Sequence, residues 1–411
     1  MICTRSAPRF YILATLLAFL SIATLKGQVA LKNANVVDVE NGTILINQTI
    51  LVNNKTIERV SSDDNIPSDY EQIDLEGRYV LPGLIDAHTH ISSIDAATRA
   101  LESGVTTARS ASVPSYQDVV IREMVKKGQL AGPEILAAGV FVTPDLGESI
   151  LADSRLGELI DGVTSDEALR KIVNINADRG VDVIKTRGTE RAGLPETDPR
   201  KQTYTQRQLT IIVEEATKRG IPVMAHAHGD EGAFAAVQAG VISIEHGTYL
   251  SERTLQLMKA KGTYLVPTYT TVVDLAEPGG DYDNPILTFR GKHMLPALQK
   301  AVSRAHQLAI PIVTGADTRY GPNSITRVST EIENFVKLGM LPVEALRSAT
   351  TLAAKLLGID DRTGIIKTGM EADLIVIQGN PLEDILSIHD VLMVMSNGTV
   401  ALKRLPFDIE E

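Results

Sequence analysis

Two stretches of the chain, one near each end, consist of short, mainly hydrophobic runs that are typical of β-strands. Short runs rich in β-branched residues, separated by Asn-Gly and Asn-Asn turn signals, occupy residues 31–39, 43–52 and 56–60. The same pattern returns at residues 372–377 and 391–399. We expect the segments 28–81 and 366–411 to pair into one small composite β-sandwich domain.

Between these segments the pattern changes to short apolar strands that alternate with amphipathic helices. Helices are predicted over residues 115–128, 165–179, 205–219, 231–239 and 251–261. Strands are expected to begin at Gly83, Val105, Glu134, Val181, Ile221, Val241, Thr263 and Ala309. This alternation predicts an α/β fold, a (β/α)8 TIM barrel over residues 82–365, with a doubly wound sheet as the alternative.

Two further features of the predicted barrel region concern its last third. Residues 324–357 are expected to form two helices, divided near Gly339 to Pro342. The segment from Asp274 to Pro285 is rich in Asp, Gly and Pro, which is typical of a mobile loop.

The first 27 residues have the pattern of a targeting segment. Arg5 and Arg9 precede an uncharged apolar run that ends at Leu25, which is typical of a secretory signal peptide. We expect a periplasmic or secreted protein with no membrane span after cleavage; an uncleaved N-terminal anchor is the alternative.

Composition narrows the classes of function. The 411 residues carry a net charge of −11 and no basic block, which argues against a nucleic-acid partner. The single cysteine, Cys3, precedes the apolar run, so the mature chain would have no thiolate metal ligand and no cysteine nucleophile. The oligomeric state stays open, and a homo-oligomer is compatible with the sequence.

Polar residues that could bind a metal end several predicted strands. His88 and His90 follow the first strand, and their i, i+2 spacing would put both imidazoles on one face. The others are Lys185, His226, His228, His246 and Asp317. The carboxyl ends of barrel strands carry the active site in this fold class, so we expect these side chains to meet.

Each of these residues also has a structural interpretation when taken alone. Lys185 could be a surface lysine, Asp317 a helix N-cap and His246 a histidine satisfied by the backbone. His293, His306 and His389 lie in helical or loop contexts and are expected to be structural. The recurrence of polar residues at the same end of successive strands favours a site.

The segments that contain these strand-end residues resemble the amidohydrolase superfamily, in particular its imidazolonepropionase-like and prolidase-like branch. The resemblance rests on four segments and a C-terminal Gly-x-Ile-x-x-Gly-x-x-Ala-Asp-Leu pattern; the segments are 82–90, 223–229, 243–248 and 314–317. It covers roughly residues 30–405 and implies a (β/α)8 barrel with a composite β-sandwich.

The resemblance also implies a ligand set and a chemistry. His88, His90 and Asp317 would hold one divalent metal ion, and His226 and His246 a second. Lys185 would bridge the two ions, zinc by preference, as a carbamate formed with carbon dioxide. Such a centre lowers the pKa of a bridging water, and Asp317 could accept its proton and pass it to the leaving amine.

Substrate-binding roles follow from positions near this ligand set. His228 would reach the substrate, Arg187 could pair with a substrate carboxylate or form a structural ion pair, and Tyr249 could line the pocket or simply pack. Prolidase-like relatives often carry Gly-Gly-His after the third strand, whereas this chain has Val142 to Ser149 there. This difference argues against a standard Xaa-Pro specificity.

Three functions remain open at this point. The first is an exported amidohydrolase that cleaves a C–N bond of a small dipeptide or N-acyl amino acid. The second is a single-metal hydrolase or deaminase of a cyclic amide or amidine, in which His246 contacts the substrate and Lys185 is not needed. The third is an exported binding protein without catalysis, which would predict decayed metal ligands.

Overall fold

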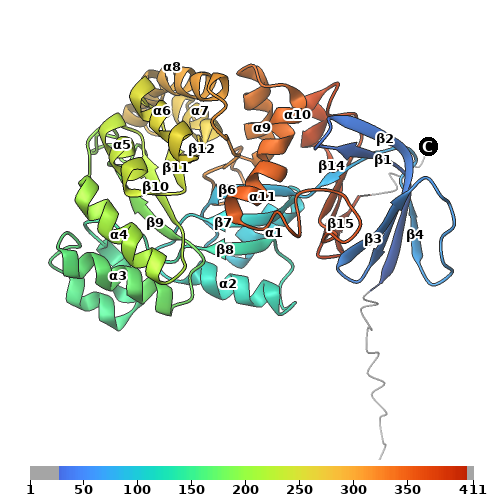
Figure 1. Cartoon of the computed structure of the whole chain (residues 1–411), viewed down its shortest axis with the longest axis horizontal. Helices are drawn as coiled ribbons and strands as arrows, with labels where there is room; N and C mark the ends of the chain where they lie inside the picture. The colour runs from blue at the N-terminus through green and yellow to red at the C-terminus, as the bar shows by residue number, and fades with distance from the viewer. Residues whose placement is uncertain (1–26, 405–411) are drawn as a thin grey trace, which may run out of the picture.

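The computed structural model describes residues 27–404 and contains a β-sheet beside a larger α/β body (Figure 1). Strands from the two ends of the described chain, blue and red in the figure, form the sheet, and the residues between them form the α/β body. The predicted signal peptide lies outside the described residues except for Gly27. Within the described part of the chain, no helix is long and apolar enough to cross a membrane.

The sheet combines both ends of the described chain. The N-terminal strands are β1 (Gln28–Asp38), β2 (Thr43–Asn53), β3 (Thr56–Ser61), β4 (Glu71–Asp74) and β5 (Tyr79–Pro82). The C-terminal strands are β13 (Leu374–Ile377), β14 (Val391–Ser396) and β15 (Thr399–Lys403). They form one sheet in the order β15-β14-β13-β5-β1-β2-β3, with β4 paired to β1. Asn397 and Gly398 join β14 to β15 with φ of 48° and 72°, as a type I′ turn requires.

Parallel strands form two arcs in the α/β body. One contains β6 (Leu84–Thr89), β7 (Val105–Ser110) and β8 (Glu134–Ala137). The other contains β9 (Ile184–Arg187), β10 (Val223–Ala227), β11 (Ser243–His246) and β12 (Tyr264–Val266). A parallel bridge between Val142 and Thr186 joins the arcs on one side. These arcs carry the strand ends on which the predicted site residues lie.

The segment predicted as the eighth strand, from Ala309, forms only an isolated bridge between Ile312 and Leu265. It still lies against β6, because Ala87 N donates to Thr314 O (3.0 Å) and Asp317 N donates to His88 O (2.7 Å). A regular ladder is interrupted because the Asp86 carboxylate accepts the Ala316 N–H (3.0 Å), which a neighbouring backbone carbonyl would otherwise accept.

Helices follow the parallel strands near the predicted positions. They are α1 (Ile94–Glu102), α2 (Gln117–Lys126), α3 (Asp166–Asp178), α4 (Gln206–Lys218), α5 (Asp230–Ala239) and α6 (Glu252–Lys261). Ser165, Thr205 and Ser251 cap the N-termini of α3, α4 and α6 through their side chains. Gly240 and Gly262 end α5 and α6 in the left-handed region, which glycine adopts without a steric penalty.

The connection predicted as a mobile loop lies between α7 (Tyr269–Ala276) and α8 (Pro285–Gln307). One hydrogen bond holds this connection to α7: the buried Asp274 carboxylate accepts the Asp281 N–H at 2.9 Å. Asn284 caps α8, and Pro285 stands at the first helical position, where its missing N–H costs nothing.

Residues 324–357 contain three helices, so the prediction of two was wrong. They are α9 (Val328–Lys337), α10 (Pro342–Ser348) and α11 (Thr351–Leu357). The division near Gly339 is present, and a second one falls at Thr350. There the Ser348 and Thr350 hydroxyls donate to the carbonyls of Ala345 and Leu346, and Thr350 leaves the helical conformation. Side-chain bonds of this kind compete with continuation of a helix. The short 3-10 helices are η1 (Gly147–Ala152), η2 (Ser154–Leu159) and η3 (Ile385–His389).

Strand β13 joins the two hydrophobic cores. Leu374 and Val376 pack into the core of the sheet, whereas Ile375 and Ile377 pack into the core shared with the parallel strands. This division follows from the strand period of two, which points successive side chains to opposite faces. The sheet is thereby held against the body that carries the strand-end histidines.

Candidate metal centre

The six predicted metal ligands come together at the carboxyl ends of the parallel strands. They are His88 (β6), His90 (just after β6), Lys185 (β9), His226 (β10), His246 (end of β11) and Asp317 (after the Ile312 bridge). His88, Lys185, His226 and His246 are buried. The side chains of Asp317 and His90 are 13% and 29% exposed, so the cluster opens toward solvent on their side.

Asp317 lies at the centre of one group of donors. Its Oδ1 is 3.1 Å from His90 Nε2 and 3.5 Å from His88 Nε2, and the donor atoms of His88, His246 and Asp317 lie within 4.8 Å of one another. Lys185 Nζ is 3.4 Å from His88 Nε2. A carboxylate and several imidazoles around one point form a donor set that suits a divalent metal ion.

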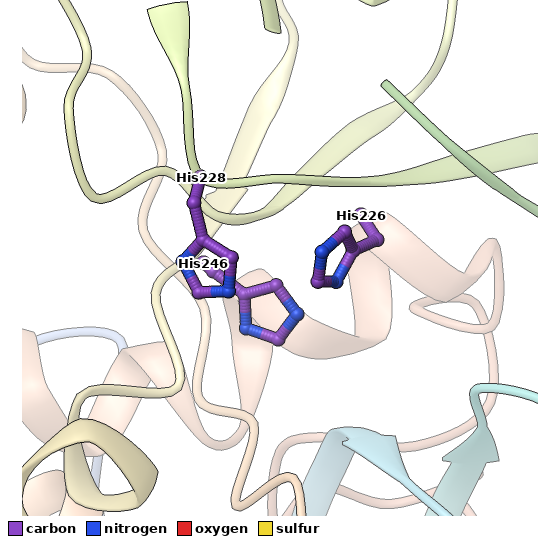
Figure 2. A group of neighbouring side chains, drawn as sticks. All are labelled: His226, His228 and His246. Atoms are coloured by element: carbon purple, nitrogen blue, oxygen red, sulfur yellow. The ribbon is translucent and has the colours of Figure 1, made fainter. Parts of the chain in front are cut away.

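A second group contains three histidines and shares His246 with the first. Figure 2 shows the imidazoles of His226, His228 and His246 gathered beside one another, and one donor atom of each lies within 4.8 Å of the others. The His228 and His246 rings stack with centroids 4.5 Å apart. His228, predicted to contact substrate, therefore lies as close to this group as the predicted ligands do.

Each of the five histidines has one ring nitrogen bonded to a partner other than the cluster. The pairs are His88 Nδ1 with Glu245 Oε2 (2.5 Å), His90 Nδ1 with Ser112 O (2.6 Å), His226 Nε2 with Glu190 O (3.0 Å), His228 Nδ1 with Thr248 Oγ1 (2.8 Å) and His246 Nδ1 with Thr268 Oγ1 (2.7 Å). Metal-binding histidines are oriented by such contacts, which leave the other nitrogen free to bind the ion. The residues present therefore fit a metal centre.

Burial sets the charge states of the cluster. It lowers the pKa of His88 to about 4 and of His228 to about 3, and it holds the pKa values of His226 and His246 well below the usual range. These imidazoles are consequently neutral at pH 7, which is the form that binds metals.

The two other charged members of the cluster respond differently to burial. Burial acts to raise the pKa of Asp317, but the neighbouring His88, His90 and Lys185 outweigh it and hold that pKa below its usual range. Burial lowers the pKa of Lys185 to about 8. Asp317 is therefore an anionic donor, and a substantial fraction of Lys185 is the neutral, nucleophilic amine near pH 8.

A buried ion pair beneath the cluster was not predicted from the sequence. Arg109 on β7 donates to Glu245 Oε1 at 3.1 Å and to Ala87 O at 2.7 Å, and both side chains are buried. Burial acts to raise the pKa of Glu245, but Arg109 and His88 outweigh it and lower that pKa to about 2. Glu245 thus stays ionised and orients His88. The sequence contained one signal for this pair, because Ser243 and Glu245 are polar residues at alternate positions of a strand expected to be buried.

Several residues around the cluster have left-handed backbone conformations. His246, Asp317 and Thr268 have φ of 74°, 45° and 47°, and Ser112, which holds His90, has φ of 97°. Residues other than glycine avoid this region, and such strain concentrates at functional sites. Here it turns the chain at the strand ends, where donor side chains and their partners are needed.

The two remaining predicted substrate contacts lie near the cluster. The Arg187 guanidinium stacks on Phe141 at 4.5 Å, its Nε is buried without a hydrogen-bond partner, and it forms no ion pair in the described residues 27–404. Burial lowers the pKa of Arg187 to about 10. Tyr249 N donates to His228 O at 2.8 Å, and its ring lies 6.4 Å from that of His293.

Comparison with known proteins yields a family match and several relatives. The sequence model of the amidohydrolase family matches residues 79–401. Ochratoxinase from Aspergillus niger is 28% identical over 394 residues, covering 84% of this chain and 80% of that protein. Imidazolonepropionase from Vibrio vulnificus is 28% identical over 346 residues, covering 75% of this chain and 80% of that protein. A crystal structure of a Xaa-Pro dipeptidase with bound methionine in its active site has a TM-score of 0.80 and 26% sequence identity. The match covers 91% of this chain and 99% of that one.

Proposed function

The chain belongs to the amidohydrolase family, and on that premise we propose that it is an exported, metal-dependent hydrolase that cleaves the amide bond of a small dipeptide or N-acyl amino acid. The family points to a hydrolase of C–N bonds. The relatives named above include a dipeptidase, and the strand-end cluster supports the metal dependence. Export is inferred from the basic and apolar N-terminal sequence.

We take the two arcs of parallel strands to form one closed (β/α)8 barrel over residues 82–365. The bridge between Val142 and Thr186 supports closure on one side. On the other side, support comes from the Leu265 bridge to Ile312 and the hydrogen bond from Asp317 N to His88 O. Segments 28–81 and 366–411 would form the appended domain. In such a barrel the site occupies the face that binds substrates in this fold class.

The residues proposed to hold two divalent ions, zinc by preference, are His88, His90, Lys185, His226, His246 and Asp317. When bound, such ions acidify a water molecule and polarise the scissile carbonyl. Lys185 is the member that favours two ions over one. It is buried and forms no ion pair with a carboxylate within residues 27–404, and a buried ammonium without a partner is costly. Conversion to a carbamate with carbon dioxide would remove that cost by making the side chain an anionic ligand.

Asp317 and His228 would move and hold protons in the reaction. Asp317, ionised and only 13% exposed, accepts the proton of the attacking water and delivers it to the leaving amine. The Thr248 hydroxyl can donate to His228 Nδ1, which leaves His228 Nε2–H free to donate to the substrate carbonyl oxygen. Both residues would then act on the same amide from a fixed position.

Arg187 supports a substrate that carries a carboxylate. Arg187 is half-buried, its Nε is buried without a hydrogen-bond partner, and it forms no ion pair with a carboxylate of the described residues. Removing part of a charge from water without an anionic partner costs free energy, which a carboxylate of the substrate would offset. The fork of Arg187 could accept a carboxylate in two parallel hydrogen bonds while Phe141 supports its other face. Tyr249 is proposed to contact the substrate beside His228, since the Tyr249 N–H donates to His228 O.

The observation that carries the proposal is the set of five histidines around an ionised aspartate and a buried lysine, in which each histidine is held through one ring nitrogen by a partner outside the cluster. The test is a screen of the purified, zinc-loaded protein against dipeptides and N-acyl amino acids, with imidazolones and cyclic ureides alongside. Amide hydrolysis is expected. Turnover of the cyclic compounds alone would replace the proposal with the imidazolonepropionase-like alternative.

A matched substrate pair sharpens the test. An N-acyl amino acid should be hydrolysed with a kcat/KM at least about 10-fold higher than its carboxamide, because only the acid can pair with Arg187. In Arg187→Met this preference should disappear, with kcat less affected than KM. An unchanged preference in the variant would remove Arg187 from the substrate site.

A further inference from the structure

The loop between β9 and α4, residues 188–205, supports two histidines of the candidate metal centre. The Glu190 carbonyl is hydrogen-bonded to His226 Nε2 (3.0 Å), and the Thr189 hydroxyl accepts the His228 N–H (3.0 Å). A bridge between Thr189 and Gln202 ties the two ends of the loop together. The orientation of His226 therefore depends on where this loop lies.

One side chain from a distant helix holds the tip of that loop. The Arg290 guanidinium on α8 donates to four backbone carbonyls, those of Ala192 (2.5 Å) and Leu194 (2.6 Å) from Nη1 and those of Pro195 (3.0 Å) and Thr197 (2.6 Å) from Nη2. Arg290 forms no ion pair with a carboxylate anywhere in residues 27–404. Its hydrogen bonds within the described residues all go to the loop.

This arrangement needs the shape of arginine. Four carbonyls that turn toward one point repel one another and require several donors fixed in one plane. A guanidinium supplies them, whereas a lysine ammonium would reach fewer of these carbonyls from a single point. Beside the clamp, a methyl group at Gly193 would lie 2.7 Å from Cε1 of Tyr282, so the loop tip also packs closely on the α7–α8 connection.

We propose that Arg290 is a positioning residue of the metal centre: by clamping the carbonyls of residues 192–197 it fixes the loop whose Glu190 carbonyl orients His226. The hydrolytic consequence rests on the proposed function, whereas the structural consequence does not. Loss of the clamp should free the loop tip, let the His226 ring rotate and weaken binding of the ion that His226 would hold.

The experiment compares wild type with Arg290→Met, Arg290→Lys and Arg304→Met. Arg304 lies on the same helix and pairs with Glu252 at the surface, so its variant controls for loss of an arginine from α8. The first readout is limited trypsin digestion at the exposed Arg191, followed by mass spectrometry. Cleavage after Arg191 should be at least about 10-fold faster in Arg290→Met, intermediate in Arg290→Lys and unchanged in Arg304→Met, because a protease needs a locally opened chain.

The second readout is zinc per chain after gel filtration of zinc-loaded protein. Arg290→Met should lose about one equivalent relative to wild type, with kcat reduced more than KM is raised, because the defect lies in the centre and not in substrate binding. Arg290→Lys should recover part of both. If Arg290→Met is insoluble, the graded comparison between Arg290→Lys and Arg304→Met gives the same two readouts.

Two results would overturn the inference. Equal trypsin sensitivity of wild type and both Arg290 variants would mean that the clamp does not hold the loop. Faster cleavage with unchanged zinc content and unchanged kcat would mean that the loop does not position His226. If wild type hydrolyses no amide, the proposed function fails, but trypsin sensitivity and zinc content still decide the role of Arg290.

Discussion

Strands β6 and β13 are both completely buried, yet they are built in opposite ways. Every side chain of β13 is apolar, Leu374 to Ile377, and packs into one of two hydrophobic cores. Strand β6 instead buries Asp86, His88 and Thr89, each with a hydrogen-bond partner. The strands are close neighbours, since β5, which runs into β6, pairs with β13.

The difference indicates that β13 mainly contributes stability, whereas β6 mainly positions residues of the candidate site. Burial of each apolar side chain in β13 contributes about 1.5–3 kcal/mol to folding. Burial of polar groups in β6 costs free energy that their hydrogen bonds only offset. Changes in the polar cluster should therefore affect activity more than stability, and changes in β13 should do the reverse.

The largest effect is expected for Asp317→Asn, which keeps the size of the side chain but removes its charge and basicity. The kcat should fall by about 10³-fold, within the range for loss of a general base, while Tm changes by only a few degrees. Steady-state kinetics and calorimetry check this, with the exposed Asp390→Asn as control. Wild type and variant that both turn over no substrate above the background rate would favour a binding protein without catalysis, and an equal rate above background would remove Asp317 from the mechanism.

A somewhat smaller effect on rate is expected for Lys185→Ala. If Lys185 bridges two ions, zinc content should fall from about two to about one per chain, and kcat should fall by about 10²-fold. Elemental analysis and kinetics measure both. One ion in fully loaded wild type, together with activity that survives in Lys185→Ala, would establish the single-metal alternative.

Leu374→Ala tests the other half of the comparison. Truncation of this fully buried side chain in the sheet core should lower the free energy of unfolding by about 2–5 kcal/mol, through lost apolar transfer and the cavity left behind. The kcat measured well below Tm should stay at the wild-type value. A large loss of kcat in the folded variant would show that the two regions are not separable.

The smallest effect concerns Glu331, a buried carboxyl far from the histidines in sequence. It accepts the Tyr269 and Thr270 N–H groups at the start of α7 (2.8 and 2.7 Å), yet burial outweighs these bonds and raises its pKa from 4.5 to about 7. Between these values the folded state binds more protons than the unfolded state, so stability should fall as pH rises through this window.

Thermal unfolding at pH 5 and pH 8 checks the sign. The loss of stability between these pH values should be smaller in Glu331→Gln than in wild type, by at most about 3 kcal/mol. Glu214→Gln, at an exposed position of α4, should keep the wild-type pH dependence. A steeper loss in Glu331→Gln would mean that the ionised carboxylate stabilises α7 more than burial penalises it.

Much of the fold and of the site could be predicted because strand and helix periods are local properties. The alternation of short apolar runs with helical patterns located β6 to β12, and the capping residues and glycines located the ends of several helices. The polar residues at those strand ends included all the histidines of the cluster. Local signals were weakest where side chains replace backbone bonds, as at the Ala309 segment and at Thr350.

The sequence by itself determined which residues end the parallel strands, because that follows from periodicity within a few residues of each histidine. Only the tertiary structure decided which nitrogen of each histidine is held by a partner outside the cluster, since these partners come from other elements of the chain. Glu245 lies 157 positions from His88, and Arg290 lies 98 from Ala192. Such pairings depend on how the chain packs in three dimensions, and no local pattern encodes them.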